Sequence, residues 1–374
     1  MEYIFWLFVF IIFYVYIGYP LVLKIINVVG KSIKKGETLP YVTLFIPAYN
    51  EANVIKAKIE NSLSLKYPIE KLEIVVASDG STDGTGHIVK DFPYKRIILF
   101  ESTERKGKNS IINEYIPRCN GEIIVFTDAN SFFKADAIKK LVKSFNDERV
   151  GCVVGNLKYI DESTSVGKGE GIYFRYESMI KELESKLGTV VAATGSIYAI
   201  RKSLFSSLDL DVANDFAHPI QIADRGYKIV FEPEAVAFEK ATSSVAEEYK
   251  RRVRIVTRGI TAFIRYRKPY HMLRGMWGFC FVSHKLFRWF IPFFLIALFL
   301  INLFLYSPFF KVTLYSQLAF YSIAIIGLFF KGKSGKLFTV PLYFCVINLA
   351  ALTGILRYIL GKRQSIWEAA KTTR

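Results

Sequence analysis

Long apolar stretches lie at the two ends of the chain, whereas short apolar runs separated by polar turns fill the middle. The long stretches cover residues 3–23, 286–306, 313–330 and 337–360. As helices, all four are long enough to cross the hydrocarbon core of a bilayer. This pattern predicts one membrane helix, then a domain outside the bilayer, and then three further membrane helices.

The short runs of the middle region have the length of buried strands and alternate with segments of helical period. Strands are expected at 42–46, 73–77, 96–100, 123–127, 150–157, 196–200 and 228–232, and helices at 53–65, 85–91, 108–115, 135–145, 169–187 and 219–226. Such alternation is typical of a doubly wound α/β sheet. We therefore predict an α/β fold to which α-helical transmembrane segments are attached.

Polar side chains follow the most apolar of these strands, which ends at Thr127. Asp128 and Asn130 come directly after it. Ligands in open α/β sheets bind beyond the carboxyl ends of the strands, and a carboxylate there can hold a divalent cation that in turn holds a phosphate. The simpler alternative is an ordinary strand-to-helix turn that Asp128 or Ser131 caps.

The formal net charge of +17 indicates contact with something acidic. No zinc-finger, helix-turn-helix or RNA-binding motif is present in the sequence, so we do not expect nucleic acid as a partner. Basic residues flank the apolar stretches. Anionic membrane lipids and a phosphorylated substrate are therefore the expected partners.

Lysines follow the first apolar stretch closely, at positions 24, 31, 34 and 35. The positive-inside rule then places Met1 outside and the middle domain in the cytoplasm of a multi-pass cell-membrane protein. Four complete crossings would put the tail outside, although it carries Lys371 and Arg374. Either one apolar stretch is not a full crossing or the rule is weak for this tail, and the sequence leaves both open.

Six short motifs follow one another between Val42 and Gly259. They are Pro47–Glu51, Ser78–Asp83, Arg105–Lys108 with Asn113, Thr127–Asn130, Gly195–Arg201, and Asn214–Phe216 with Pro219, Gly226-Tyr227 and Pro233–Ala235. In this order they resemble the motifs of the family 2 glycosyltransferases. The likeness is greatest to the membrane-embedded branch that includes hyaluronan, poly-N-acetylglucosamine and cellulose synthases, and residues 283–289 resemble its entry to the following span.

The resemblance implies a GT-A fold that binds a nucleotide-sugar, usually a UDP-sugar, with a divalent metal, Mg²⁺ or Mn²⁺. The residues that would bind the nucleotide-sugar are Pro47, Asn50, Glu51, Asp79, Lys108, Asp128 and Arg254. Of these, Asn50, Glu51 and Asp79 would contact uridine, and Lys108 would approach the diphosphate. Asp128 would hold both the metal and the diphosphate.

On the acceptor side, the resemblance implies that Asp215 deprotonates the attacking hydroxyl and that Gly195 and Ser196 lie beside the acceptor. The same assignments follow from chemistry. Breaking a sugar–diphosphate bond leaves negative charge on the nucleotide, which a cation must stabilise. The acceptor hydroxyl needs a base on the opposite side.

Two positions depart from the family pattern. Asn130 stands where the second carboxylate of Asp-x-Asp is expected, and a neutral amide is a weaker ligand for a hard cation. Residues 251–255 lie where polymerising members have Gln-x-x-Arg-Trp, and only Arg254 matches. Processive polymer synthesis therefore does not follow from the resemblance.

Each assigned residue also has a simpler structural alternative. Asp79 can be a turn former, Lys108 a solvated helix start, and Asp215 the cap of the helix that follows it. The arginines at 251, 252, 254 and 258 can equally form an amphipathic helix on lipid headgroups. Among these four, we favour a place in the site only for Arg254.

The leading hypothesis is a membrane-bound inverting glycosyltransferase of the hexosyltransferase type. It would transfer a sugar to a polysaccharide or lipid-linked acceptor in cell-surface glycan synthesis. The alternative is a non-catalytic nucleotide- or sugar-binding partner of a membrane glycan synthase or export complex, which Asn130 favours and Asp128 with Asp215 disfavours. The expected division of the chain is an N-terminal transmembrane helix (1–30), a cytoplasmic catalytic domain (38–262), an interfacial segment (263–285), C-terminal transmembrane helices (286–362) and a basic tail (363–374).

Overall fold

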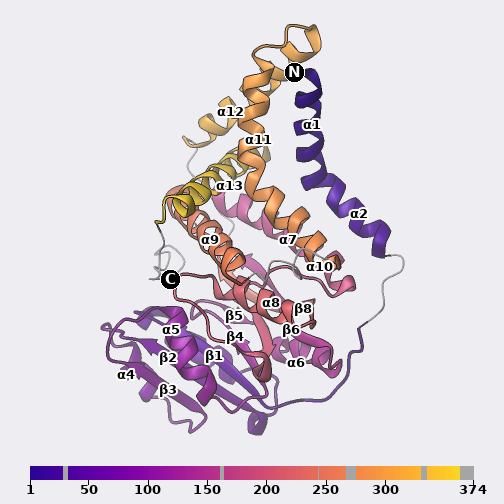
Figure 1. Cartoon of the computed structure of the whole chain (residues 1–374). Coiled ribbons are helices and arrows are strands. Elements are labelled where there is room, and N and C mark those ends of the chain that lie inside the picture. Colours follow the sequence, from indigo (N-terminus) through magenta and orange to yellow (C-terminus); the bar gives the residue numbers. More distant parts are fainter. Residues whose placement is uncertain (28–32, 161–163, 243, 267–274, 330–334, 363–374) are drawn as a thin grey trace.

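The structure is a computed structural model that describes residues 1–27, 33–160, 164–242, 244–266, 275–329 and 335–362. An α/β domain occupies one end of the molecule, and long apolar helices rise from one side of it (Figure 1). The α/β class with attached apolar helices is thus confirmed. The predicted basic tail at 363–374 lies outside the described residues.

Eight strands form one sheet in the order β3-β2-β1-β4-β7-β6-β8-β5. Their bounds are β1 Val42–Ala48, β2 Leu72–Asp79, β3 Ile97–Ser102, β4 Ile123–Phe126, β5 Phe132–Phe133, β6 Val150–Ile160, β7 Tyr198–Arg201 and β8 Lys228–Lys240. Strands β1 to β4 pair in parallel, and β6 pairs in parallel with β8. Strand β7 is antiparallel to both of its neighbours, and β5 is antiparallel to β8, so the sheet is mixed.

The reversed direction of β7 matters for the site. In its pairing with β4, Phe126 lies opposite Tyr198. Because the two strands run in opposite directions, β7 begins at the sheet edge where β4 ends. Gly195, just before β7, is therefore brought next to Asp128, just after β4, from which it is distant in sequence.

Helices cover both faces of the sheet. They are α3 Ala52–Leu63, α4 Thr85–Lys90 and α6 Ala137–Val142 on one face, and α5 Lys108–Tyr115, α7 Ser165–Leu187, α8 Asn214–Asp224 and α9 Val245–Tyr266 on the other. The core of the second face also contains Tyr19, Phe281, Trp289 and Ala351 from the apolar helices. The α/β domain and the apolar helices therefore share one hydrophobic core.

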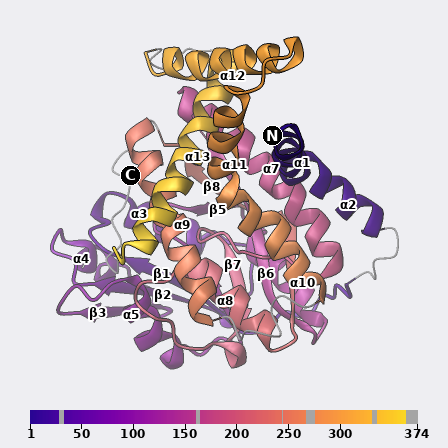
Figure 2. The same cartoon turned by 45° about the horizontal axis from the view of Figure 1, so that its top comes forward.

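Four helices of the described chain are long and apolar enough to cross a membrane: Glu2–Ile26, Gly275–Asn302, Pro308–Gly327 and Lys336–Ile359. The first two are continuous through π-helical turns, which join α1 Glu2–Phe13 to α2 Tyr19–Ile26 and α10 Gly275–Phe281 to α11 Phe287–Asn302. Figure 2 shows α12 (Pro308–Gly327) lying across the far ends of α11 and α13 (Lys336–Ile359).

Two boundaries differ from the sequence-based expectation. The span expected from Leu286 is part of a helix that begins at Gly275, because Gly278, Cys280 and Phe281 are buried against the α/β domain. The helix expected from Pro219 begins at Asn214. Proline is the sixth residue of α8 and has no N–H for the carbonyl of Asp215, which instead accepts a hydrogen bond from the Ala193 amide at 2.8 Å.

Candidate active site

The first two motifs form one interlocked pair of turns after β1 and β2. Asn50 has the only positive φ among described residues other than glycine, at 53°, and its Oδ1 accepts from the Thr82 amide at 2.8 Å. The Asp83 carboxylate accepts from the Ala52 amide at 2.9 Å, and Thr85 Oγ1 accepts from the Glu51 amide at 2.9 Å. Pro47 and Glu51 are buried in this junction. These contacts hold the start of α3 against the second motif.

Asp79 anchors the third motif. Its carboxylate is buried and accepts hydrogen bonds from the amides of Lys106, at 2.7 Å, and Gly107, at 2.9 Å. At Gly80, whose φ is +65°, a Cβ atom would lie 2.7 Å from the Arg105 nitrogen, so the two loops touch closely. The geometry therefore gives Asp79 the role of positioning the loop that presents Lys108.

Lys108 and Asp128 meet directly. The Lys108 Nζ atom lies 2.6 Å from Asp128 Oδ1, and the two side chains are 12% and 21% exposed. Both line the main cavity. Asn130 is buried instead, 8% exposed, and is not one of the described residues that line this cavity. The two polar residues that follow β4 thus lie in different surroundings.

A buried lysine that the sequence analysis did not select supports this loop. Lys58 on α3 donates to Thr127 Oγ1 at 2.8 Å and to the Ser131 carbonyl. Burial lowers its pKa to about 7, although the charges of Asp128 and Glu239 oppose that change. Helical spacing in the sequence could have indicated that Lys58 is buried, because it lies on the same face of α3 as Ile55 and Ser62.

Asp215 lies in the first turn of α8. Its Oδ2 atom accepts from the Gly195 amide at 3.2 Å. A Cβ atom on Gly195 would lie 3.4 Å from Asp215 Oδ2 and 3.7 Å from Asp128 Oδ2, so the two carboxylates converge on this glycine. Ser196, also assigned to the acceptor side, is buried and lines the same cavity.

The electrostatic surroundings of Asp215 suit a proton acceptor. Burial raises the pKa of its carboxyl, and the negative charge of Asp128 adds to the increase. The cations of Lys108, Arg258 and Lys181 oppose both effects. A carboxylate with a raised pKa is a stronger base than an ordinary one, and the nearby cations favour its ionised form.

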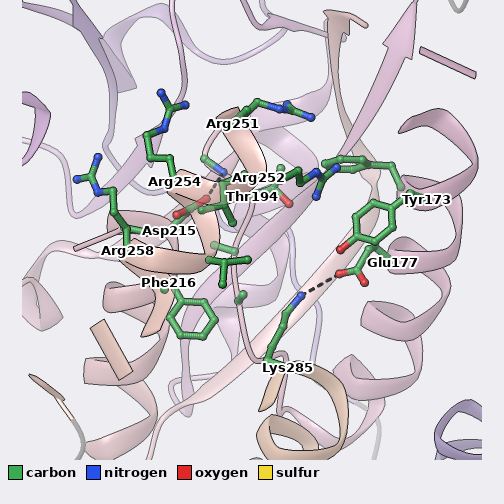
Figure 3. A pocket seen from close by; sticks show the side chains of 18 of the residues that line it. Tyr173, Glu177, Thr194, Asp215, Phe216, Arg251, Arg252, Arg254, Arg258 and Lys285 are labelled. Atoms are coloured by element: carbon green, nitrogen blue, oxygen red, sulfur yellow. Dashed lines mark hydrogen bonds and ion pairs between the residues drawn. The ribbon is translucent and has the colours of Figure 1, made fainter. Parts of the chain in front are cut away.

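The arginines of α9 divide into separate roles. Arg251 pairs with Glu170 and Glu248, and Arg252 pairs with Glu248 at 2.7 Å. Arg258 donates to the carbonyl oxygens of Val212 and Leu210 and so orders the segment before Asp215. Figure 3 shows Arg254 and Arg258 on the Asp215 side of the cavity.

Burial settles the lipid-headgroup alternative for part of this helix. Arg252 and Arg258 are enclosed by protein, so this alternative is wrong for these two residues. Arg254 lines the cavity together with Asp128 and Asp215.

One cavity of about 310 Å³ joins these groups. It extends from Lys108 and Asp128, past Gly195 and Asp215, to the apolar helices. At that end, the residues lining it include Tyr16, Lys285, Arg288, Trp289, Asn348 and Ala351. The sequence analysis noted residues 283–289 only as resembling the entry to a span and assigned none of them, nor any other residue of the apolar helices, to the site. Nothing in the local pattern of those helices indicates that they face the same cavity as Asp215.

Comparison with known proteins finds similarity to glycosyltransferases. Residues 43–208 match the family described as Glycosyl transferase family 2. The probable glycosyltransferase YdaM of Bacillus subtilis is 32% identical over 230 residues, which are 58% of this chain and 54% of that protein. A poly-β-1,6-N-acetyl-D-glucosamine synthase of Staphylococcus aureus is 28% identical over 236 residues, covering 61% of this chain and 57% of the synthase. The chain thus spans about half the length of these relatives.

A solved structure resembles nearly the whole chain. It is the mannosyltransferase PcManGT from Pyrobaculum calidifontis in complex with GDP-mannose and Mn²⁺. The two are 23% identical and superpose with a TM-score of 0.73, over 96% of this chain and 99% of the other. This likeness confirms the predicted GT-A fold, and it includes the apolar helices.

Proposed function

The chain carries a family 2 glycosyltransferase domain at residues 43–208, and we propose that it is a membrane-bound inverting glycosyltransferase. It transfers a sugar from a nucleotide-sugar to a glycan or lipid-linked acceptor. The observation that carries this proposal is the convergence of Asp128 and Asp215 on Gly195. This convergence supports a mechanism in which Asp128 serves the donor diphosphate and Asp215 the acceptor hydroxyl, as an inverting displacement requires.

The reaction moves one proton and one sugar. The acceptor hydroxyl attacks the anomeric carbon while its proton passes to Asp215, and the bond from the anomeric carbon to the diphosphate oxygen breaks. The nucleoside diphosphate leaves with the bonding electron pair. Lys108, and Arg254 from the other wall of the cavity, stabilise the charge that develops on it.

The residues present fit a divalent cation that is bound mainly through the donor. Among the described residues, no three His, Cys, Asp or Glu side chains form a group that could hold a metal alone. Asp128 offers one carboxylate to the cavity, and Mg²⁺ commonly takes one or two carboxylates together with substrate phosphates. When bound, Mg²⁺ or Mn²⁺ would neutralise charge on the diphosphate.

A UDP-sugar is the donor that we propose, because the motifs that hold Asn50 and Asp79 resemble those of UDP-sugar enzymes. The structural neighbour was solved with GDP-mannose. A panel of donors must therefore include both bases.

We further propose a membrane arrangement in which α12 lies along the outer surface and does not cross. Glu2–Ile26 then enters the cytoplasm, Gly275–Asn302 leaves it, and α13 returns to the side of the α/β domain, as the path in Figures 1 and 2 suggests. Three crossings place the basic tail in the cytoplasm. This arrangement removes the conflict with the positive-inside rule that four crossings create.

The test of the function uses the purified full chain in detergent or nanodiscs. UDP- and GDP-sugars are supplied with Mg²⁺ or Mn²⁺, and release of the nucleoside diphosphate is measured, with Asp215→Asn as the control. We expect release that depends on the metal and on Asp215. Nucleotide binding without any turnover, for every donor and with extracted membrane lipids added, would favour the non-catalytic alternative.

A further inference from the structure

The cavity continues beyond Asp215 into a strongly basic region between the apolar helices. Of the described residues that line the cavity, eight are Lys or Arg and four are Asp or Glu. Its far end is formed by Tyr16 of the first apolar helix, Lys285 and Arg288 of the helix Gly275–Asn302, and Asn348 of α13. Ionisable residues inside apolar helices are costly, so a functional role is the first explanation to test.

Arg288 has donor capacity that the protein does not use. Its side chain is 10% exposed, and its Nη1 atom donates to Glu177. Its Nε and Nη2 atoms are buried and have no hydrogen-bond partner among the described residues. Unpaired buried donors of a charged group are costly. A guanidinium with two free N–H groups presents the fork that suits a phosphate or carboxylate.

The charges around Arg288 are unbalanced. Glu177 is the carboxylate that pairs with it, and the same carboxylate also accepts from Lys285 at 2.9 Å. Burial alone would raise the pKa of Glu177, but Lys285 and Arg288 hold it well below its usual range. Two basic side chains, both lining the cavity, thus share one carboxylate. Figure 3 shows the pair formed by Lys285 and Glu177.

His284 adds no negative charge beside Lys285 and Arg288. It lies between Glu177, at 3.2 Å, and Glu184, at 2.7 Å, and the Tyr19 hydroxyl donates to Glu184 at 2.7 Å. Glu184 is therefore engaged away from Arg288. No described acidic residue other than Glu177 forms an ion pair with Lys285 or Arg288.

The basic end is connected to the catalytic carboxylates. Lys181 lies one helical turn after Glu177 on α7 and donates to Thr194 Oγ1 at 2.6 Å, beside Gly195. Aromatic side chains, among them Tyr173 and Phe216, line the space between the two ends (Figure 3). Such surfaces suit the apolar faces of a sugar, whereas the apolar helices beyond Arg288 suit a hydrocarbon chain.

We propose that the end of the cavity at Tyr16, Lys285 and Arg288 binds the phosphate or diphosphate of a lipid-linked saccharide, which is the acceptor. The saccharide then extends past Tyr173 and Phe216 so that its terminal hydroxyl meets Asp215. The inference rests on the proposed function, which it makes more specific. An acceptor of this kind is anchored by charge at one end, whereas a neutral glycan polymer would offer no anionic group to the Nε and Nη2 donors of Arg288.

The test measures binding of a defined probe to the full chain in phosphatidylcholine nanodiscs, with EDTA present to weaken the donor site. The probes are farnesyl diphosphate, farnesol and inorganic pyrophosphate. The first carries a lipid chain and a diphosphate, the second carries the lipid chain alone, and the third is the diphosphate alone. We expect farnesyl diphosphate to bind at least about tenfold tighter than either of the others, because only it offers both groups. Arg288→Gln should weaken it by about tenfold or more.

The matched control is Arg357→Gln, an exposed arginine at the end of α13 that does not line the cavity. It should leave binding of farnesyl diphosphate unchanged. If Arg288→Gln does not fold, Arg288→Lys decides, since it keeps the charge beside Glu177 but loses the fork, and we expect binding to weaken about threefold or more. Equal binding of farnesol, or equally tight binding of pyrophosphate, would overturn the proposal.

Donor turnover by the wild type is measured in the same preparation. Absence of turnover while the probe binds through Arg288 would count against the proposed function. If the wild type turns over the donor but Arg288→Gln binds the probe as tightly as the wild type does, the result would count against the phosphate site alone.

Discussion

Lys108 and Asp128 form an ion pair with 2.6 Å between Nζ and Oδ1, at the point where the donor diphosphate is expected to bind. The pair keeps both side chains in place, because each is the other's partly buried counter-charge. A cation at Asp128 must share this carboxylate with the lysine. Donor phosphates, which attract both the cation and Lys108, relieve that competition. We therefore expect metal and nucleotide to bind cooperatively.

The first prediction concerns Asp128→Ala. Removing the carboxylate takes away the proposed ligand for the cation, so nucleotide affinity should fall at least about tenfold, on the order of 1.4 kcal/mol. Calorimetry with UDP and GDP, with Mn²⁺ and then with EDTA, measures the change. Affinity that neither the substitution nor EDTA alters would show that the metal does not bridge Asp128 and the diphosphate.

The second prediction concerns Asp215→Asn. The amide keeps the shape and the acceptor for the Gly195 N–H but cannot take a proton. The variant should fold and bind the nucleotide, while transfer falls by about 10²-fold or more. Near-normal transfer would leave Asp215 with only the role of ordering Gly195.

The third prediction is the pH dependence of the wild type. Burial raises the pKa of Asp215, and only the deprotonated carboxylate can act as a base. The value of kcat/KM should therefore rise with pH as Asp215 loses its proton. On acidification, the loss of activity should begin at a higher pH than it would for a carboxyl with an ordinary pKa. A pH–rate profile of the free enzyme measures this, and an acid limb at or below the usual aspartate range would contradict it.

The fourth prediction concerns Asn130→Asp. If position 130 faced the metal, a second carboxylate would tighten Mn²⁺ binding. Since Asn130 is buried and does not line the cavity, we expect unchanged Mn²⁺ affinity. We also expect a loss of stability of at least about 1–3 kcal/mol, which is the cost of burying an uncharged polar group, because a carboxylate near Asp128 costs more to bury. Titration with Mn²⁺ and thermal unfolding report the two effects separately, and tighter metal binding would place residue 130 at the metal.

The fifth prediction concerns a fragment of residues 37–262. The hydrophobic core beneath α8 and α9 includes Phe281, Trp289 and Ala351, which the fragment lacks. Exposing that surface should make the fragment aggregate or transfer sugar much more slowly than the full chain. Comparing the two for solubility and for transfer to the natural acceptor tests this, and equal rates would show that the apolar helices do not help to seat the acceptor.

The sequence by itself determined those features that depend on neighbours along the chain. Strand β4, expected at 123–127 and found at Ile123–Phe126, follows from local pattern and turn chemistry, as do the polar turns after β1 and β2 and the helix starting at Lys108. In parallel strands, the carboxyl ends share one edge of the sheet. This is why the local pattern could place Asp128 beyond a strand end, whereas Asn50 and Asp79 were assigned through the family resemblance.

Only the tertiary structure decided the relationships that depend on distant segments. The antiparallel course of β7 places Gly195 between Asp128 and Asp215, and Pro219 leaves the Asp215 carbonyl free for Ala193. The apolar helices could be predicted as membrane spans from the sequence, because hydropathy depends only on which residues a segment contains. That Arg288 and Tyr16 face the same cavity as Asp215 depends on how those helices pack against α7 and α13, and packing is settled by the whole molecule.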